Sequence, residues 1–315
     1  MVCARIGKCA IASLAKIRDL TLHEASAPGR PKHLSAASGL VIVKSWLYVV
    51  ADDEHHLGVF AAEGDAPGDL IRIIDGDLPE GKKDRKRRKP DFEALLLLPP
   101  FSHCAHGALL AVGSGSRENR GRGVLLSLDE QGRAGAAPRV IDLSRLFAPI
   151  ERQINGLNIE GATVVSDRLI LLQRGNKRDG VNALISLALG PVLRSLATGD
   201  TVDRIPFTVR PCDLGSIHAV PLTFTDAATL PDGRIVFTAV AEDTDDSYLD
   251  GACAGAAVGI LGADGDWQRI ERLHPDAKVE GIDARLSGDR IRLLLVSDAD
   301  DARIPASLYA AEIGV

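Results

Sequence analysis

Residues 159–209 contain four short apolar segments in succession: IEGATVV (159–165), RLILLQR (168–174), NALISLAL (182–189) and RIPFTV (204–209). Each segment is rich in Val, Ile and Leu, and the intervening loops contain Gly, Asp and Asn, which favour turns. The pattern predicts four consecutive β-strands. The next part of the chain repeats it as FTDAATL (224–230), RIVFTAV (234–240), AAVGILG (256–262) and WQRIERL (267–273).

Five such units follow one another, and each opens with an acidic or hydroxyl residue followed by a small residue. The openings lie at intervals of 55, 67, 66 and 54 residues, at Ser38, Glu93, Glu160, Asp226 and Glu280. Four strands per unit, repeated around a circle, are the plan of a β-propeller. We therefore predict an all-β chain whose residues 1–315 form a single propeller domain of five four-stranded blades. Six blades or a two-sheet sandwich are the alternatives.

The last unit contains only three strands, VEGIDARL (279–286), RIRLLLVS (290–297) and SLYAAEI (307–313). The N-terminal segment SLAKIRDLTL (13–22) precedes the first unit and can supply the missing strand. Closure of this kind removes the open edge that makes sheets prone to aggregation. We expect the N-terminal strand to complete the last blade, and we expect no amphipathic helix.

The composition restricts the class of function. The net charge is −6, and this argues against a nucleic-acid-binding protein. No apolar stretch reaches 18 residues and none resembles a signal peptide, so we expect no membrane association and a cytoplasmic protein. Five scattered cysteines predict neither a disulfide framework nor a zinc cluster.

The five openings should form a ring where the innermost strands begin. The ring residues are Ser38, Glu93, Glu160, Asp226 and Glu280. Four carboxylates near one axis repel one another, so the ring needs a cation, bound protons or abundant water. Ca²⁺ suits it, because this ion takes six to eight oxygen ligands in a flexible shell. In the alternative interpretation, the carboxylates accept hydrogen bonds from backbone amides at the strand starts.

Loops on the same face carry cationic residues in blades two and three. We assign Arg117, Arg120, Arg174 and Lys177 as candidate ligands for a phosphate-bearing small molecule, because guanidinium groups bind phosphate bidentately. The basic run KKDRKRRK (82–89) joins blades one and two. We expect it to be a solvated loop, and a flap that attracts anions over the mouth is the alternative.

The layout resembles the calcium-activated nucleotidases (apyrases), which are five-bladed propellers with a Ca²⁺ ion held in the tunnel by Ser and Glu residues from successive blades. The segments SGLVIVKSWLYVVADD (38–53), LLAVGSGSREN (109–119) and VEGID (279–283) carry this resemblance. It implies Ca²⁺ at the ring and a phosphate-containing substrate. The openings of the type Glu-Gly-small are also similar to those of phytase-like and gluconolactonase-like propellers.

Three hypotheses for the function follow. The first is a Ca²⁺-dependent hydrolase of a phosphoanhydride or phosphoester, in which Glu93 or Glu160 accepts a proton from water. The second is a metal-dependent lactonase or esterase at the same ion. The third is a binding or scaffold propeller in which the ion has a structural role.

Overall fold

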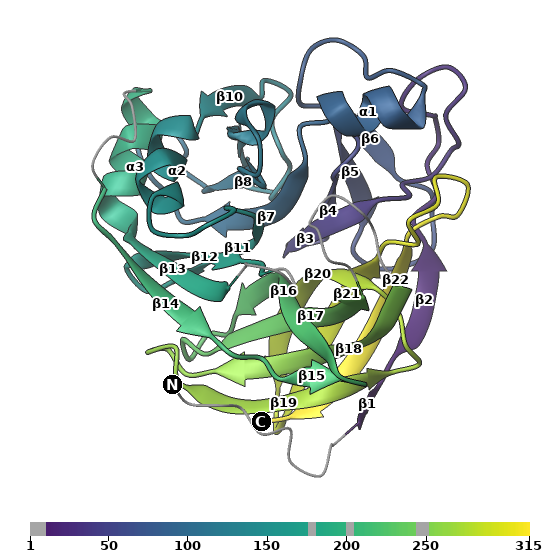
Figure 1. Cartoon of the computed structure of the whole chain (residues 1–315). Helices are drawn as coiled ribbons and strands as arrows, with labels where there is room; N and C mark the ends of the chain where they lie inside the picture. Colours follow the sequence, from purple (N-terminus) through teal and green to yellow (C-terminus); the bar gives the residue numbers. More distant parts are fainter. Residues whose placement is uncertain (1–10, 176–180, 200–204, 244–251) are drawn as a thin grey trace.

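The structure is a computed structural model that describes residues 11–175, 181–199, 205–243 and 252–315. Five antiparallel four-stranded sheets surround a central axis (Figure 1). Their inner strands contact one another in the order β3, β7, β11, β16, β20 and back to β3, so the ring is closed. The prediction of a five-bladed β-propeller is confirmed.

The blades follow the chain, with each inner strand first. Blade one is β3 (Ala37–Val43), β4 (Trp46–Ala51), β5 (His56–Ala61) and β6 (Asp69–Arg72). Blade two is β7 (Phe92–Leu98), β8 (Ala108–Gly113), β9 (Arg122–Ser127) and β10 (Arg139–Asp142). Blade three is β11 (Ile159–Val165), β12 (Arg168–Gln173), β13 (Asn182–Ala188) and β14 (Phe207–Cys212). Blade four is β16 (Val220–Thr229), β17 (Ile235–Asp243), β18 (Ala252–Leu261) and β19 (Trp267–His274).

Blade five closes the ring as predicted. It consists of β20 (Val279–Ser287), β21 (Arg290–Ser297), β22 (Ser307–Gly314) and the N-terminal strand β2 (Ala15–Asp19). β2 pairs antiparallel with β22, so the first and last parts of the chain share one sheet. Two short strands extend blade four: β1 (Ile11–Ser13) pairs parallel with β19, and β15 (Ser216–Ile217) pairs with β16.

The hydrophobic core is divided into five clusters, each between two neighbouring blades. The strands supply these clusters because their Val, Leu and Ile side chains are buried on both faces of most sheets. Each blade is thus held mainly by its two neighbours, and the polar residues at the strand ends are left to line the axis.

Three short helices correct the expectation that helices are absent: α1 (Lys82–Arg88), α2 (Ser144–Glu151) and α3 (Leu189–Thr198). α2 and α3 bury their apolar faces against the cluster between blades two and three. The sequence pattern missed α3 because it follows β13 directly and begins at Leu189, the last residue of the expected strand. No described helix is long and apolar enough to cross a membrane.

The basic run 82–89 is not the solvated loop that we expected. Residues 82–88 form α1, and Arg85 within it is buried. A short 3₁₀ helix, η1 (Glu118–Arg120), lies in the loop of blade two after β8.

Candidate functional site at the mouth of the propeller

A β-bulge occurs at the same place in all five inner strands. In each strand one residue is skipped in the pairing with the second strand of the blade, and these residues are Ser38, Glu93, Glu160, Thr225 and Glu280. Bulges re-aim a side chain and are common beside functional sites. We call the end of the propeller at which these bulges lie the mouth.

In blade four, the bulge residue is Thr225 and not Asp226. Thr225 donates a hydrogen bond to the hydroxyl oxygen of Thr238 (2.9 Å). Asp226 lies one residue further along β16, at the position that is occupied by Gly161 in blade three and Gly281 in blade five. The structure therefore brings four of the five predicted ring residues to equivalent positions and places the fifth one step away.

Asp226 lies where neighbouring inner strands approach closely. A Cβ atom added to Gly161 would lie 2.7 Å from the Cα of Asp226, which is closer than side-chain atoms pack. The carboxylate of Asp226 accepts a hydrogen bond from the amide of Ile282 (3.0 Å), which ties blade four to blade five. Burial raises the pKa of Asp226 well above its ordinary value, against the opposing effect of the amides of Ile282, Ala227 and Ala162.

The mouth contains a cavity of about 510 Å³. Among the described residues, ten carboxyl side chains and nine cationic side chains line it. Of the bulge residues, Glu93 and Glu160 belong to this lining, whereas Ser38, Thr225 and Glu280 are buried beside it. A cavity so rich in paired charges suits a small polar ligand.

A backbone hydrogen bond that recurs in four blades places pairs of residues beside the bulges. In four blades, the residue after the second strand donates its amide to the carbonyl two residues before the bulge: Asp52 to Ala36, Ser114 to Asp91, Arg174 to Asn158 and Asp298 to Lys278. Each blade therefore directs a pair of residues to the mouth, and most of these residues are charged or polar.

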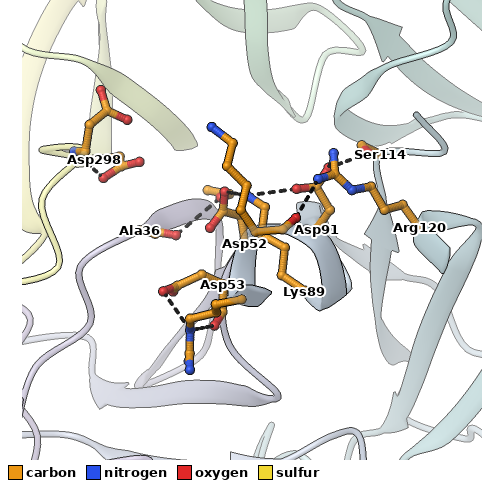
Figure 2. Close-up of polar contacts among 12 residues, drawn as sticks. Ala36, Asp52, Asp53, Lys89, Asp91, Ser114, Arg120 and Asp298 are labelled. Carbon is orange, nitrogen blue, oxygen red and sulfur yellow. Dashed lines mark hydrogen bonds and ion pairs between the residues drawn. The ribbon is translucent and has the colours of Figure 1, made fainter. Parts of the chain in front are cut away.

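Lys89 links blades one and two. Its ammonium group forms ion pairs with Asp52 and with Asp91 (2.8 Å to Asp91 Oδ1). The other oxygen of Asp91 accepts hydrogen bonds from Arg120 (2.7 Å) and Ser114 (2.6 Å). Figure 2 shows Asp52, Lys89 and Asp91 together, with Ser114 and Arg120 on one side and Asp298 on the other.

Arg174 links blades three and four. Its guanidinium group contacts Glu160 (3.0 Å) and Glu242 (2.5 Å). The other oxygen of Glu160 accepts a hydrogen bond from the amide group of Asn158 (2.6 Å). Both oxygens of Glu160 therefore have nitrogen donors.

Lys278 holds the carboxylates of blades four and five. Its ammonium group lies 3.5 Å from both Glu242 and Glu280 and 2.7 Å from Asp300. Burial raises the pKa of Glu280 to about 7, although the charges of Lys278 and Arg174 oppose this shift.

Glu93 differs from its neighbours. It forms no hydrogen bond or ion pair within the part of the chain that the structure describes. Burial raises its pKa well above the ordinary value, and the charges of Glu160, Asp91 and Asp52 raise it further. Glu93 is thus a carboxyl group that lines the cavity and whose surroundings favour its protonated form.

The donor set is chemically suited to a hard divalent cation. One carboxylate oxygen from each of Asp52, Asp91 and Glu93 lies within 4.8 Å of the others. Among the described residues around the floor of the mouth, seven carboxyl groups (Asp52, Asp91, Glu93, Glu160, Glu242, Glu280 and Asp298) lie near four cations (Lys89, Arg120, Arg174 and Lys278). If all seven were ionised, these described groups would carry three more negative than positive charges, and protons or a bound cation can neutralise such an excess.

The predicted substrate-binding residues have different positions. Arg120 and Arg174 line the cavity, but both are held by carboxylates. Arg117 is exposed and is not part of the lining. Lys177 lies outside the described residues. The sequence reasoning did not identify Lys89, Asp91, Asn158 and Lys278 as site residues, although a shared position two residues before the bulge could have revealed the last three.

Comparisons with known proteins place the chain in context. The model of a family of unknown function, DUF6929, matches residues 33–313, and no curated protein matches. The α-L-arabinofuranosidase PaAbf62A from Podospora anserina, solved with cellotriose, is 11% identical, with 96% of each chain covered and a TM-score of 0.51. The catalytic domain of a GH62 α-L-arabinofuranosidase from Coprinopsis cinerea is 10% identical, with 96% of this chain and 95% of that one covered and a TM-score of 0.51. A putative gluconolactonase is 14% identical over 95% of this chain and 97% of that one, with a TM-score of 0.39.

Identities of this size show a shared fold alone. The structural neighbours include hydrolases, and none of these three is a nucleotidase. The resemblance to calcium-activated nucleotidases stays a prediction.

Proposed function

The chain belongs to the family DUF6929, and from the chemistry of its mouth we propose that it is a hydrolase of a small polar molecule, with Glu93 as the proton-transferring group. One observation carries the proposal. Glu93 has a pKa raised well above its ordinary value by burial and by neighbouring carboxylates, it has no hydrogen bond or ion pair in the described chain, and it lines a cavity of about 510 Å³ beside carboxylates that contact cations. Two carboxyl groups in such different environments are the arrangement that general acid–base catalysis requires.

Glu93 and Glu160 would have complementary roles. Glu160 forms an ion pair with Arg174 and accepts a hydrogen bond from the side-chain amide of Asn158. It would accept a proton from the attacking water, whose oxygen bonds to the carbon or phosphorus of an ester. Glu93 would give its proton to the leaving oxygen as the ester bond breaks. Proton exchange with solvent would then restore both groups.

A divalent cation fits the acidic floor of this site. The ion would take the place of the proton on Glu93, because a carboxylate that coordinates a cation cannot also donate a proton. Asp52, Asp91 and Glu93 would then hold the ion, and Lys89, which contacts Asp52 and Asp91, would share their oxygens or move aside. When bound, a Ca²⁺ ion would supply positive charge that polarises an ester or phosphoryl oxygen.

The test is a substrate panel with metal-stripped protein, alone and with added Ca²⁺ or Mg²⁺. The panel contains p-nitrophenyl phosphate, p-nitrophenyl acetate and δ-valerolactone. We expect hydrolysis of one class, and we expect Glu93→Gln to lower the rate at least about 100-fold. Glu130→Gln serves as the control, because Glu130 is exposed in the turn after β9. Equal rates for the two variants would refute the role of Glu93.

A binding propeller is the second candidate, and the cations at the mouth favour it. Lys89, Arg174 and Lys278 already neutralise several of the carboxylates, as expected for a network with a structural role. This function predicts a higher melting temperature with Ca²⁺, because a ligand that binds only the folded state stabilises it. It also predicts that no member of the panel is hydrolysed.

A further inference from the structure

We propose that Gly175, Pro221 and Thr223 form a subsite for a short aliphatic group of the molecule that enters the mouth. We call these three residues the neutral wall. All three line the cavity and none carries a charge, whereas most of the other described lining residues are charged. At the neutral wall, a ligand can therefore bury apolar surface without removing water from an ion, which would be costly.

Asn182, on β13, joins the two blades that supply the neutral wall. Its side-chain oxygen accepts a hydrogen bond from the amide of Gly175 (2.9 Å) in blade three. Its side-chain nitrogen donates to the carbonyl oxygen of Leu222 (2.9 Å), which lies between Pro221 and Thr223 on β16 of blade four. The wall is thus fixed before a ligand arrives, so little conformational entropy is lost when an aliphatic group packs against it.

The side-chain donors of the neutral wall are already used or absent. The hydroxyl group of Thr223 donates to the carbonyl oxygen of Val240 (3.2 Å), which leaves its methyl group for contact with a ligand. Pro221 presents an apolar ring and has no N–H group. Gly175 has no side chain, and its amide already donates to Asn182. The wall therefore offers carbon atoms to a ligand and no free side-chain donor.

The remaining lining decides which uncharged group fits. The other described uncharged lining residues are Ser35, Ala36, Asn158 and Ala302. No described lining residue is aromatic, so a nucleobase or another flat ring would find no stacking partner among them. An aliphatic chain needs no such partner. We therefore expect a ligand with a polar group at the charged floor and a short aliphatic group at the neutral wall.

The neutral wall adjoins the base of the proposed reaction. Gly175 directly follows Arg174, whose guanidinium group contacts Glu160 (3.0 Å). The inference rests on the proposed function in assigning the ligand as an ester whose reacting group meets Glu160 and Glu93 while its aliphatic group lies at the wall. Binding of a stable analogue requires no hydrolysis, so the wall can be tested separately.

The probes are methylphosphonate and butylphosphonate, whose phosphorus–carbon bonds resist hydrolysis. Their binding to the metal-free full chain is measured by calorimetry at fixed pH and salt. Both carry the same anionic group, so the ratio of their dissociation constants isolates the effect of the chain. Each buried methylene group strengthens binding about fourfold, and we expect butylphosphonate to bind at least about tenfold more tightly than methylphosphonate.

Variants of Thr223 locate the subsite. Thr223→Leu fills the space at the wall and should bring the two dissociation constants within about twofold of each other, because a packed site does not accept extra methylene groups. Its binding of methylphosphonate should stay within about twofold of that of the natural chain, which also shows that the variant is folded. Thr223→Val should keep the preference for butylphosphonate. The matched control is Thr229→Leu, at the far end of β16 and outside the cavity lining, which should also keep it.

Three results would overturn the inference: no binding of either probe by the natural chain, equal binding of the two probes, or a preference for butylphosphonate that survives Thr223→Leu. A preference that Thr223→Leu removes, without hydrolysis of any panel member, would support the neutral wall while it refutes the proposed hydrolase. Hydrolysis that depends on Glu93, with no preference between the probes, would support the hydrolase and overturn the inference.

Discussion

Replacement of Arg174 with Gln should destabilise the protein, because it removes the cation shared by two buried carboxylates. Arg174 contacts Glu160 at 3.0 Å and Glu242 at 2.5 Å, and its side chain is only 14% exposed. Gln keeps part of the side-chain length but carries no charge. Breaking a buried ion pair typically costs about 3–5 kcal/mol, since a charge is left uncompensated.

The magnitude should lie at the lower end of that range. Glu160 keeps the hydrogen bond from Asn158, and Glu242 keeps the ammonium group of Lys278 at 3.5 Å. We therefore expect a loss of about 3 kcal/mol in the free energy of unfolding. If the 315-residue chain unfolds as one unit, this corresponds to a decrease of about 4–5 °C in melting temperature.

Urea unfolding and calorimetry of metal-stripped protein measure this effect. The control is Arg152→Gln, an exposed arginine just after α2. The double variant Arg174→Gln/Glu242→Gln should recover at least about 1 kcal/mol, because one of the two uncompensated carboxylates is removed. A loss for Arg174→Gln no larger than that of the control would refute the ion-pair account of the mouth.

Further predictions concern pH and packing. Glu280 has a raised pKa of about 7, so its contribution to stability is present below about pH 4.5 and is lost as pH rises through 7. In urea unfolding of metal-free protein, the free energy of unfolding of Glu280→Gln relative to that of the natural chain should therefore increase by about 3 kcal/mol as pH rises between these limits. Glu54 has a lowered pKa of about 2, so its contribution is present above about pH 4.5 and is lost as pH falls to 2; Glu54→Gln should cost about 3 kcal/mol at pH 7 and nothing below pH 2. Gly161→Ala would place a Cβ atom 2.7 Å from the backbone of Asp226 and should cost about 1–3 kcal/mol in urea unfolding. Gly81→Ala meets no atom within 4 Å and should cost only about 0.5 kcal/mol, because Gly81 is the N-cap of α1 and Ala is a weaker cap than Gly. A pH-independent difference for either glutamate variant, or equal stability of the two alanine variants, would contradict the corresponding argument.

The repeat predicted the blades and their closure because these depend on local pattern. In blade four, the predicted ring residue Asp226 lies one residue after the bulge residue Thr225, and the reason can be identified. Asp226 is the nearest acidic residue to the expected opening, and the prediction aligned acid with acid. In the structure, the bulge residue directly follows an apolar residue in every blade, as Glu93 follows Phe92 and Thr225 follows Phe224.

The ion pairs could not be predicted, because their partners come from different blades. Lys278 precedes β20, whereas one of its partners, Glu242, lies on β17 of the neighbouring blade. α1 was also hidden, since its sequence has no apolar face and its position depends on the pairing of Arg85 with Asp53 and Glu54. Both features follow from long-range contacts and not from local propensity.

Blade four replaces its missing ring carboxylate from another strand. Its bulge residue is Thr225, which carries no charge, but Glu242 on β17 contacts both Arg174 and Lys278. Glu242 thereby joins the carboxylates of blades three and five through shared cations. Between blades three and five, Glu160, Glu242 and Glu280 are therefore linked by the shared cations Arg174 and Lys278.

On the opposite side of the mouth, between blades one and two, not every described carboxyl group contacts a cation. There, the single segment 82–93 carries the rim lysine Lys82, the floor cation Lys89 with its partner Asp91, and the unpaired carboxyl group of Glu93. A ligand that draws on the cations of this segment removes positive charge from the surroundings of Glu93 and so strengthens its hold on the proton. If the proposed hydrolase function is correct, binding of an anionic substrate near Lys89 should therefore raise the pKa of Glu93 further and favour the protonated form that donates to the leaving oxygen.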